Sequence, residues 1–171
     1  MSWTAPRTWV AGETVTAALL NTHLRDNLLA QAGVVAATSS SNTTATSTGA
    51  TEALHAGLAI SPTTIESGRY YWIDVFGRAG YSAATGVVGV RVHASQSAIT
   101  TGSPTVAQGN VRCEVAAPNG AYDLPVVRYL WTPGAAGTWN LQVGVVSVVG
   151  AGNASFGLGA VNATLTLTTA L

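Results

Sequence analysis

The stretch RYYWIDVF, residues 69–76, carries large apolar side chains on both faces of the strand that it predicts. Side chains alternate between the two faces of a strand, so every second residue of this stretch shares a face. One face holds Tyr71, Ile73 and Val75, and the other holds Tyr70, Trp72 and Phe76. A strand that is apolar on both faces is expected to be covered twice, either inside a sandwich of two sheets or between subunits.

The chain after this stretch continues as short runs in which apolar and polar residues alternate, the pattern of half-buried strands. The clearest runs are residues 86–94, 110–116, 124–131, 138–149 and 161–169. With a further short strand near residues 55–60, they predict seven or eight strands joined by Gly- and Pro-rich turns. No helical period interrupts them. The expected fold is therefore mainly β, an antiparallel sandwich, and the number of strands suits a jelly roll.

Individual positions and one turn follow from the same patterns. In residues 86–94 the alternation places three valines in the core and leaves Arg91 and His93 facing solvent. Cys113 lies on the apolar face of the next run and is expected in the core. Residues 118–120, PNG, predict a tight hairpin, because Asn-Gly tolerates the positive φ that such a turn needs.

The first 33 residues differ from the rest, because they contain the one convincing helical pattern. Thr14 or Thr16 can cap this helix by accepting a hydrogen bond from a free backbone N–H, and Gly33 suits its left-handed end. At about 100° per residue, most of the apolar side chains gather on one side. That side holds Ala17, Leu20, Leu24, Leu28 and Leu29, and the other holds Thr22, Asp26 and Asn27. Such a helix must bury its apolar face against another surface.

The chain accordingly divides into three expected regions. Residues 1–33 are an anchoring arm, which begins as an extended segment with Trp3 and Trp9 and continues as the helix. Residues 34–51 are rich in Ser and Thr, whose small side chains do not build a core, and are predicted to be a spacer. Residues 52–171 are the β-domain.

Composition limits the classes of partner. The formal net charge of zero gives no reason to expect a nucleic acid or an anionic membrane as a partner. Only 8% of the residues are charged, against roughly 25% in soluble domains. This low charge fits a surface covered by other subunits, and it equally fits the codon bias of a GC-rich genome. The single Cys113 excludes a disulfide within the chain, and neither a signal peptide nor a membrane-spanning helix is expected.

The residues suggest no catalytic site, no cofactor and no metal. None of His23, His55 and His93 has a second ligand at metal-binding spacing. Asp74 is the most unusual acid because it lies inside the aromatic stretch. It is expected to pair with Arg69, Arg78 or Arg91, or else to face a cleft together with Tyr70 and Trp72. Tyr70, Trp72 and Asp74 are the candidate glycan contacts. The competing interpretation places Trp72, Trp131 and Trp139 in the core and between subunits.

Residues 3–28, WTAPRTWVAGETVTAALLNTHLRDNL, resemble a recurrent N-terminal segment of tailed-bacteriophage virion proteins. Its elements are Trp-Val-x-Gly-Glu, Val-Thr-Ala and Leu-Asn-x-His-x-Arg-Asp-Asn, which stand here at residues 9–13, 15–17 and 20–27. The match covers about 25 residues. More loosely, residues 62–79 and the last run are similar to the small tumour-necrosis-factor-like jelly rolls that follow such arms.

This resemblance implies a non-enzymatic structural subunit of the virion, made in the cytoplasm of a bacterial host and often trimeric. The implied partners are further copies of the chain and the major capsid protein or a tail protein. The assembly residues would be Trp3, Trp9, Leu20, Leu24, Leu28 and Leu29. Because the chain is short, we expect a capsid decoration protein rather than a minor tail protein. The alternatives are a glycan-binding module at a tail tip and a polysaccharide-degrading enzyme that uses Asp74.

Overall fold

The computed structural model describes residues 11–21, 35–83, 85–114, 121–157 and 162–170. In these ranges the chain is mainly β, with one helix of four residues and ten strands. The helix is α1 (Ala17–Leu20). The strands are β1 (Val35–Ser41), β2 (Ala45–Thr46), β3 (Ala53–Ile65), β4 (Tyr71–Tyr81), β5 (Thr85–Ser95), β6 (Thr105–Glu114), β7 (Ala121–Trp131), β8 (Gly137–Val149), β9 (Ala154–Phe156) and β10 (Ala163–Thr169).

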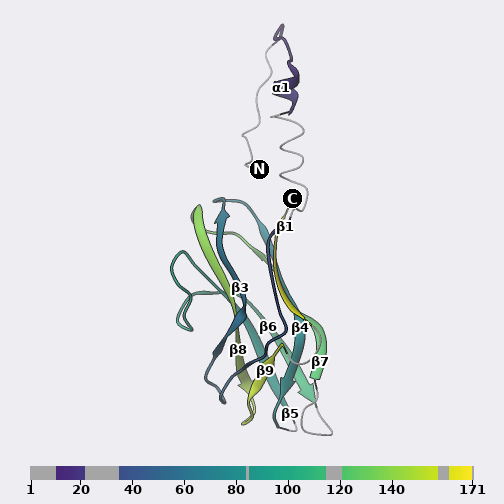
Figure 1. The fold of residues 1–171 in the computed structure, drawn as a ribbon, viewed down its shortest axis with the longest axis vertical. Coiled ribbons are helices and arrows are strands. Elements are labelled where there is room, and N and C mark those ends of the chain that lie inside the picture. The colour runs from purple at the N-terminus through teal and green to yellow at the C-terminus, as the bar shows by residue number, and fades with distance from the viewer. Residues whose placement is uncertain (1–10, 22–34, 84, 115–120, 158–161, 171) are drawn as a thin grey trace.

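The strands form two antiparallel sheets, which lie against each other in Figure 1. The first sheet has the order β1-β10-β4-β7, and the second has the order β3-β8-β5-β6. Because β7 pairs along one edge of β4, the other edge of β4 is shared by β10, at residues 71–76, and by β9, at residues 79–81. The short strand β2 extends the first sheet by pairing with β9.

The core lies between the sheets, where each strand directs its apolar side chains. The predicted inward faces of 69–76, 138–149 and 161–169 are confirmed wherever the structure describes their residues. Fully buried are Ile73 and Val75 on β4, Val88, Val90 and Val92 on β5, Leu141, Val143 and Val145 on β8, and Leu165 and Leu167 on β10. Cys113 is also in the core as predicted, and burial raises the pKa of its thiol.

An aromatic cluster joins the sheets at one end of this core. Tyr71 on β4 and Trp131 on β7 are neighbours in the first sheet, with ring centroids 6.2 Å apart. Trp139 on β8, in the second sheet, meets Trp131 edge to face at 5.3 Å. Such pairs stabilise beyond the area that they bury. The backbone N–H of Glu66 donates a 3.0 Å hydrogen bond to the Tyr71 hydroxyl, so the polar end of this ring is satisfied.

The Ser/Thr-rich region is not only a spacer, because residues 35–41 and 45–46 form β1 and β2. Apart from a bulge near its start, β1 pairs along its length with β10, and Ser41 is buried while Ser40 is exposed. Small hydroxyl side chains contribute little apolar burial, so the backbone ladder to β10 stabilises this strand instead. The expectation failed because it considered side chains alone, and residues of this type also take part in sheets when a neighbour supplies the hydrogen bonds.

The predicted hairpin at residues 118–120 lies outside the described ranges and stays a prediction. Of the strands on either side of it, β6 pairs with β5 in the second sheet and β7 pairs with β4 in the first.

The described part of the predicted helix is α1. Thr16 is its N-cap, as predicted, and its hydroxyl accepts a 3.3 Å hydrogen bond from the N–H of Leu19. No residue of α1 is buried. Figure 1 shows α1 beyond the end of the two sheets. Residues 22–34, which hold the rest of the predicted helix, lie outside the described ranges.

Tyr81 at the end of β4 is held by a compact set of contacts. Its hydroxyl is 2.9 Å from that of Ser147 and accepts a 2.7 Å hydrogen bond from the N–H of Gly152. The ring packs directly over Gly86 on β5, where a Cβ atom would collide with its carbon atoms. Gly86 is therefore required for space.

We predict that Gly86→Ala lowers the free energy of unfolding by about 1–3 kcal/mol, because the buried Tyr81 ring must shift to admit the methyl group. Urea unfolding followed by circular dichroism measures the change. Gly134→Ala is the matched control, because no atom lies within 4 Å of its Cβ position. Equal stability of the two variants would contradict the packing described for Tyr81.

Candidate functional site

The outer face of the first sheet carries the side chains that point away from the core. On β4 these include Trp72, which is half-buried, and Phe76, which is 41% exposed. The register sets Trp72 between Leu130 of β7 and Thr168 of β10. The described residues therefore cover residues 69–76 on one face only, and the second apolar face of this stretch is open.

Asp74 lies one step further along this face and forms an ion pair with Arg128, with 3.6 Å between a carboxylate oxygen and Nε. The sequence suggested Arg69, Arg78 or Arg91 as its partner. That choice was wrong, because Arg128 stands directly opposite Asp74 on β7. Both side chains are exposed, so the pair contributes less than about 1 kcal/mol. Its main effect is to place opposite charges side by side.

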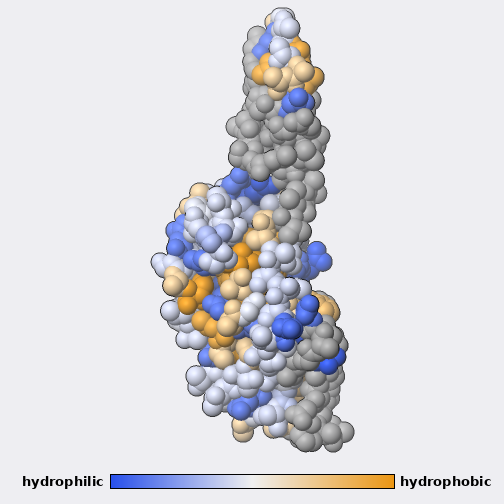
Figure 2. Space-filling view, viewed as in Figure 1, coloured by the Kyte–Doolittle hydropathy of each residue, from blue (hydrophilic) through white to orange (hydrophobic). Residues whose placement is uncertain are grey.

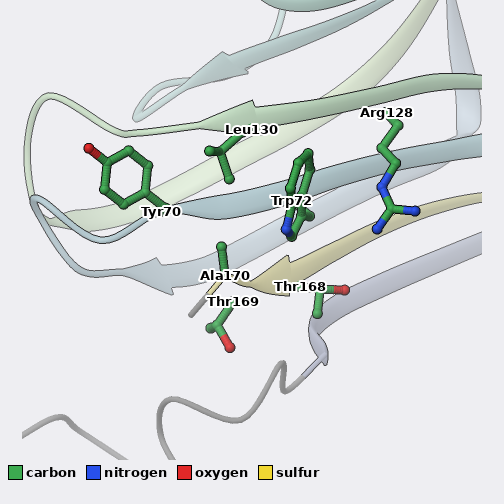
Figure 3. A pocket seen from close by; sticks show the side chains of 7 residues that line it. All are labelled: Tyr70, Trp72, Arg128, Leu130, Thr168, Thr169 and Ala170. Atoms are coloured by element: carbon green, nitrogen blue, oxygen red, sulfur yellow. The ribbon is translucent and has the colours of Figure 1, made fainter.

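An open cleft of about 580 Å³ lies at one end of the same face (Figure 3). Its lining includes Tyr70, Trp72, Arg128, Leu130, Thr168 and Ala170. Figure 3 shows the indole of Trp72 nearly edge-on, with Tyr70 to one side and Arg128 to the other. The guanidinium carbon of Arg128 is 5.0 Å from the centroid of the Trp72 ring, a cation–π contact.

The candidate glycan residues are only partly brought together here. Tyr70 and Trp72 line the cleft. Asp74 is not among its lining residues, but it forms an ion pair with Arg128, which is. The competing interpretation placed three tryptophans in the core or between subunits. It is confirmed for Trp131, which is buried in the core, while Trp139 is partly buried against the core and Trp72 lies on the outer face.

The other lining residues were missed, because strand order decides their position. Arg128 and Leu130 are 56 and 58 residues from Trp72 in the chain, and Thr168 is further away. They meet only because β4 lies between β7 and β10. The alternation in residues 124–131 and 161–169 shows which side chains share a face, and it does not show which strands are neighbours.

Of the predicted assembly residues, the structure describes Leu20 alone. It is 41% exposed at the end of α1. Trp3, Trp9, Leu24, Leu28 and Leu29 lie outside the described ranges.

A second polar group lies on the outer face of the other sheet. His93 on β5, expected to face solvent, is only 1% exposed, because Glu52 and Ser103 cover it. Its Nε2 is 2.7 Å from one carboxylate oxygen of Glu52, and Arg91 donates a 3.0 Å hydrogen bond to the other. A Cβ at Gly144 would collide with Glu52, so this glycine makes room for the pair.

The hydrogen bonds of His93 indicate a structural role. Its Nδ1 is 2.8 Å from the carbonyl oxygen of Ser103, which only accepts, so Nδ1 carries a hydrogen. Its Nε2 lies within hydrogen-bond distance of the Glu52 carboxylate. Both ring nitrogens are therefore engaged, and the ring is out of reach of solvent. The cluster ties the segment before β3 and the loop before β6 to the sheet.

His55 on β3 is the second buried imidazole among the described residues. Its Nε2 donates a 3.0 Å hydrogen bond to the carbonyl of Thr43, while Nδ1 has no hydrogen-bond partner. Its ring meets Phe156 edge to face at 6.4 Å. Burial lowers the pKa of His55, since the charged form loses its hydration. The ring is accordingly held as the neutral Nε2–H tautomer.

The described ranges contain no group of three or more His, Cys, Asp or Glu side chains that could hold a metal ion. Among the same residues, no helix has the length and apolarity needed to cross a bilayer.

Comparison with known proteins returns no assignment. No protein-family model matches the chain, and no relative is found among curated proteins.

We predict that Glu52→Ala lowers the free energy of unfolding by about 2–3 kcal/mol, because it leaves the buried Nε2 of His93 and the Arg91 guanidinium without their shared partner. Glu66→Ala is the control, because it removes a more exposed pair with Arg69 and is expected to cost less than about 1 kcal/mol. Chemical denaturation compares the two. A loss at Glu52 no larger than that at Glu66 would refute the structural role of the cluster.

A pH dependence follows from His55. The unfolded chain binds more protons below the ordinary pKa of 6.5 than the fold does, so acid favours unfolding. Stability should be complete above about pH 6.5 and fall as the pH drops toward the lower pKa of the folded state. His55→Gln keeps an N–H donor and does not titrate, so its melting temperature should fall less between pH 7 and pH 5. Identical pH profiles would rule out this contribution.

Proposed function

We propose that the chain is a non-enzymatic structural subunit of a bacteriophage virion, a capsid decoration protein that docks through its N-terminal arm. The observation that carries this proposal is the uncovered start of the helix. Val15 and Leu20 are 51% and 41% exposed, and no residue of α1 is buried. Figure 2 shows hydrophobic residues on the surface at the end of the molecule that holds α1. The phage-like motif in residues 3–28 lies in the same region.

The physics of the helix supports an external partner. The described helix α1 has four residues. Because so short a helix is marginal in water on its own, a docking surface would stabilise it. The described residues leave Val15 and Leu20 exposed. Burial of Leu20, Leu24 and Leu28 on another protein would contribute about 1.5–3 kcal/mol for each side chain before the cost of association. Three arms acting together would multiply that gain.

The β-domain is proposed to be a jelly-roll sandwich, and strand order supports this. A jelly roll has eight strands in two sheets, built from two Greek keys. Here β1-β10-β4-β7 lies against β3-β8-β5-β6, and apart from the short strands nearly every connection crosses between the sheets. The connection from β5 to β6 stays within one sheet.

Trimer formation is the proposed oligomeric state. Support comes from the low content of charged residues and from large apolar side chains left exposed on the strands. These include Tyr129 on β7 and Val148 and Val149 at the end of β8. Such exposure is common at subunit interfaces. The alternative placement, as a minor tail protein, would use the same arm.

We predict that Leu24→Glu with Leu28→Glu abolishes incorporation into particles, because charges on the apolar face of the arm oppose docking. Thr22→Glu with Asn27→Glu changes the predicted polar side and should leave incorporation intact. Quantitative immunoblots of purified particles measure the number of copies, and circular dichroism checks that both variants keep their β-structure. Normal incorporation of the leucine variant would contradict anchoring by the arm. Gold-labelled antibody then distinguishes head from tail.

A further inference from the structure

Backbone pairing positions the residues that line the cleft beside Trp72. Tyr70 lies just before β4, yet its backbone is fixed because its carbonyl accepts a 2.9 Å hydrogen bond from the N–H of Ala170. The guanidinium of Arg128 covers one side of the Trp72 ring, and it also forms the ion pair with Asp74. The side of the indole toward Tyr70 is left facing the cleft, as Figure 3 shows.

We propose that this cleft binds a pyranose ring of a neutral carbohydrate. The axial C–H groups of a pyranose make one apolar face, which packs on an aromatic ring, while its hydroxyls project from the edge. Tyr70 and Trp72 provide two aromatic walls, each an apolar ring with a polar tip. The cleft volume of about 580 Å³ lies in the range of small-molecule sites, about 300–1,000 Å³.

The charges around the cleft favour a neutral ligand. Among the described residues that line it, Arg128 alone is charged, and the carboxylate of Asp74 lies 3.6 Å from that guanidinium. An anionic sugar or a phosphate would have to compete with Asp74 for the same cation. The pair can instead offer a donor and an acceptor to neighbouring sugar hydroxyls.

The surroundings favour a sugar over a second protein chain. Outward residues of β10 are the threonines Thr164, Thr166 and Thr168, which alternate with its buried residues, and Thr166 lies 3.4 Å from the hydroxyl of Thr38 on β1. This part of the face is a row of hydroxyls, whereas the core of a stable protein interface is enriched in large side chains. The binding role goes beyond the assembly role proposed above and does not depend on it.

The test applies the full-length protein to a printed array of oligosaccharides that includes maltohexaose, chitohexaose and, as an acidic counterpart, hexagalacturonic acid. Neutral ligands found there are then titrated by calorimetry. Trp72→Ala and Tyr70→Ala should each weaken binding at least about tenfold, equivalent to about 1.4 kcal/mol. Phe76→Ala is the matched control, because this exposed ring lies on the same outer face and does not line the cleft. It should bind as the wild type does.

Three outcomes would overturn the proposal. The folded wild type could bind no glycan on the array, it could bind acidic glycans only, or Trp72→Ala and Phe76→Ala could bind equally well. Light scattering on the same samples tests whether a second protein chain, rather than a sugar, occupies the cleft. If Trp72→Ala dissociates the oligomer and no sugar binds, the cleft is a protein interface and the carbohydrate proposal fails. Loss of sugar binding with normal incorporation into particles would leave the assembly role intact.

Discussion

The last strand of the chain pairs with β1 on one edge and β4 on the other, and this double pairing is the constraint on which the rest of the structure depends. It turns a Ser/Thr-rich segment into β1 by supplying the backbone partners that its side chains do not replace. It also brings Thr168 beside Trp72 and fixes Tyr70 through Ala170. Without β10 in this position, β4 would have no ladder along residues 71–76 on that edge, and the cleft would lose one of its walls.

The side chains of β4 alternate between the core and the outer face of the sheet. Ile73 and Val75 face the core and are fully buried, which contributes about 1.5–3 kcal/mol each before chain entropy is counted. Trp72 and Phe76 face outward, and the described part of the chain leaves both partly exposed. The same alternation that builds the core therefore also presents aromatic rings to solvent.

Much of the β-structure could be predicted because alternation is a local property. The inward positions of Leu141, Leu165 and Cys113 follow from period two alone. Position in the sheet is different, since it depends on partners far away in the chain. Hence the strand at residues 35–41, the burial of His93 under Glu52 and the pairing of Asp74 with Arg128 were not foreseen. Of the residues that line the cleft, Tyr70 and Trp72 were predicted from the sequence.

The described residues leave α1 and the outer face of the first sheet uncovered, and both proposals rest on this exposure. Hydroxyl-radical footprinting of the full-length protein, read out by mass spectrometry, tests this most directly. Rapid modification of Leu20, Tyr70 and Trp72, with Trp131 protected in the core, is the result that the account predicts. Protection of Trp72 equal to that of Trp131 in a monomeric sample would contradict it, because another part of the chain would then cover this face.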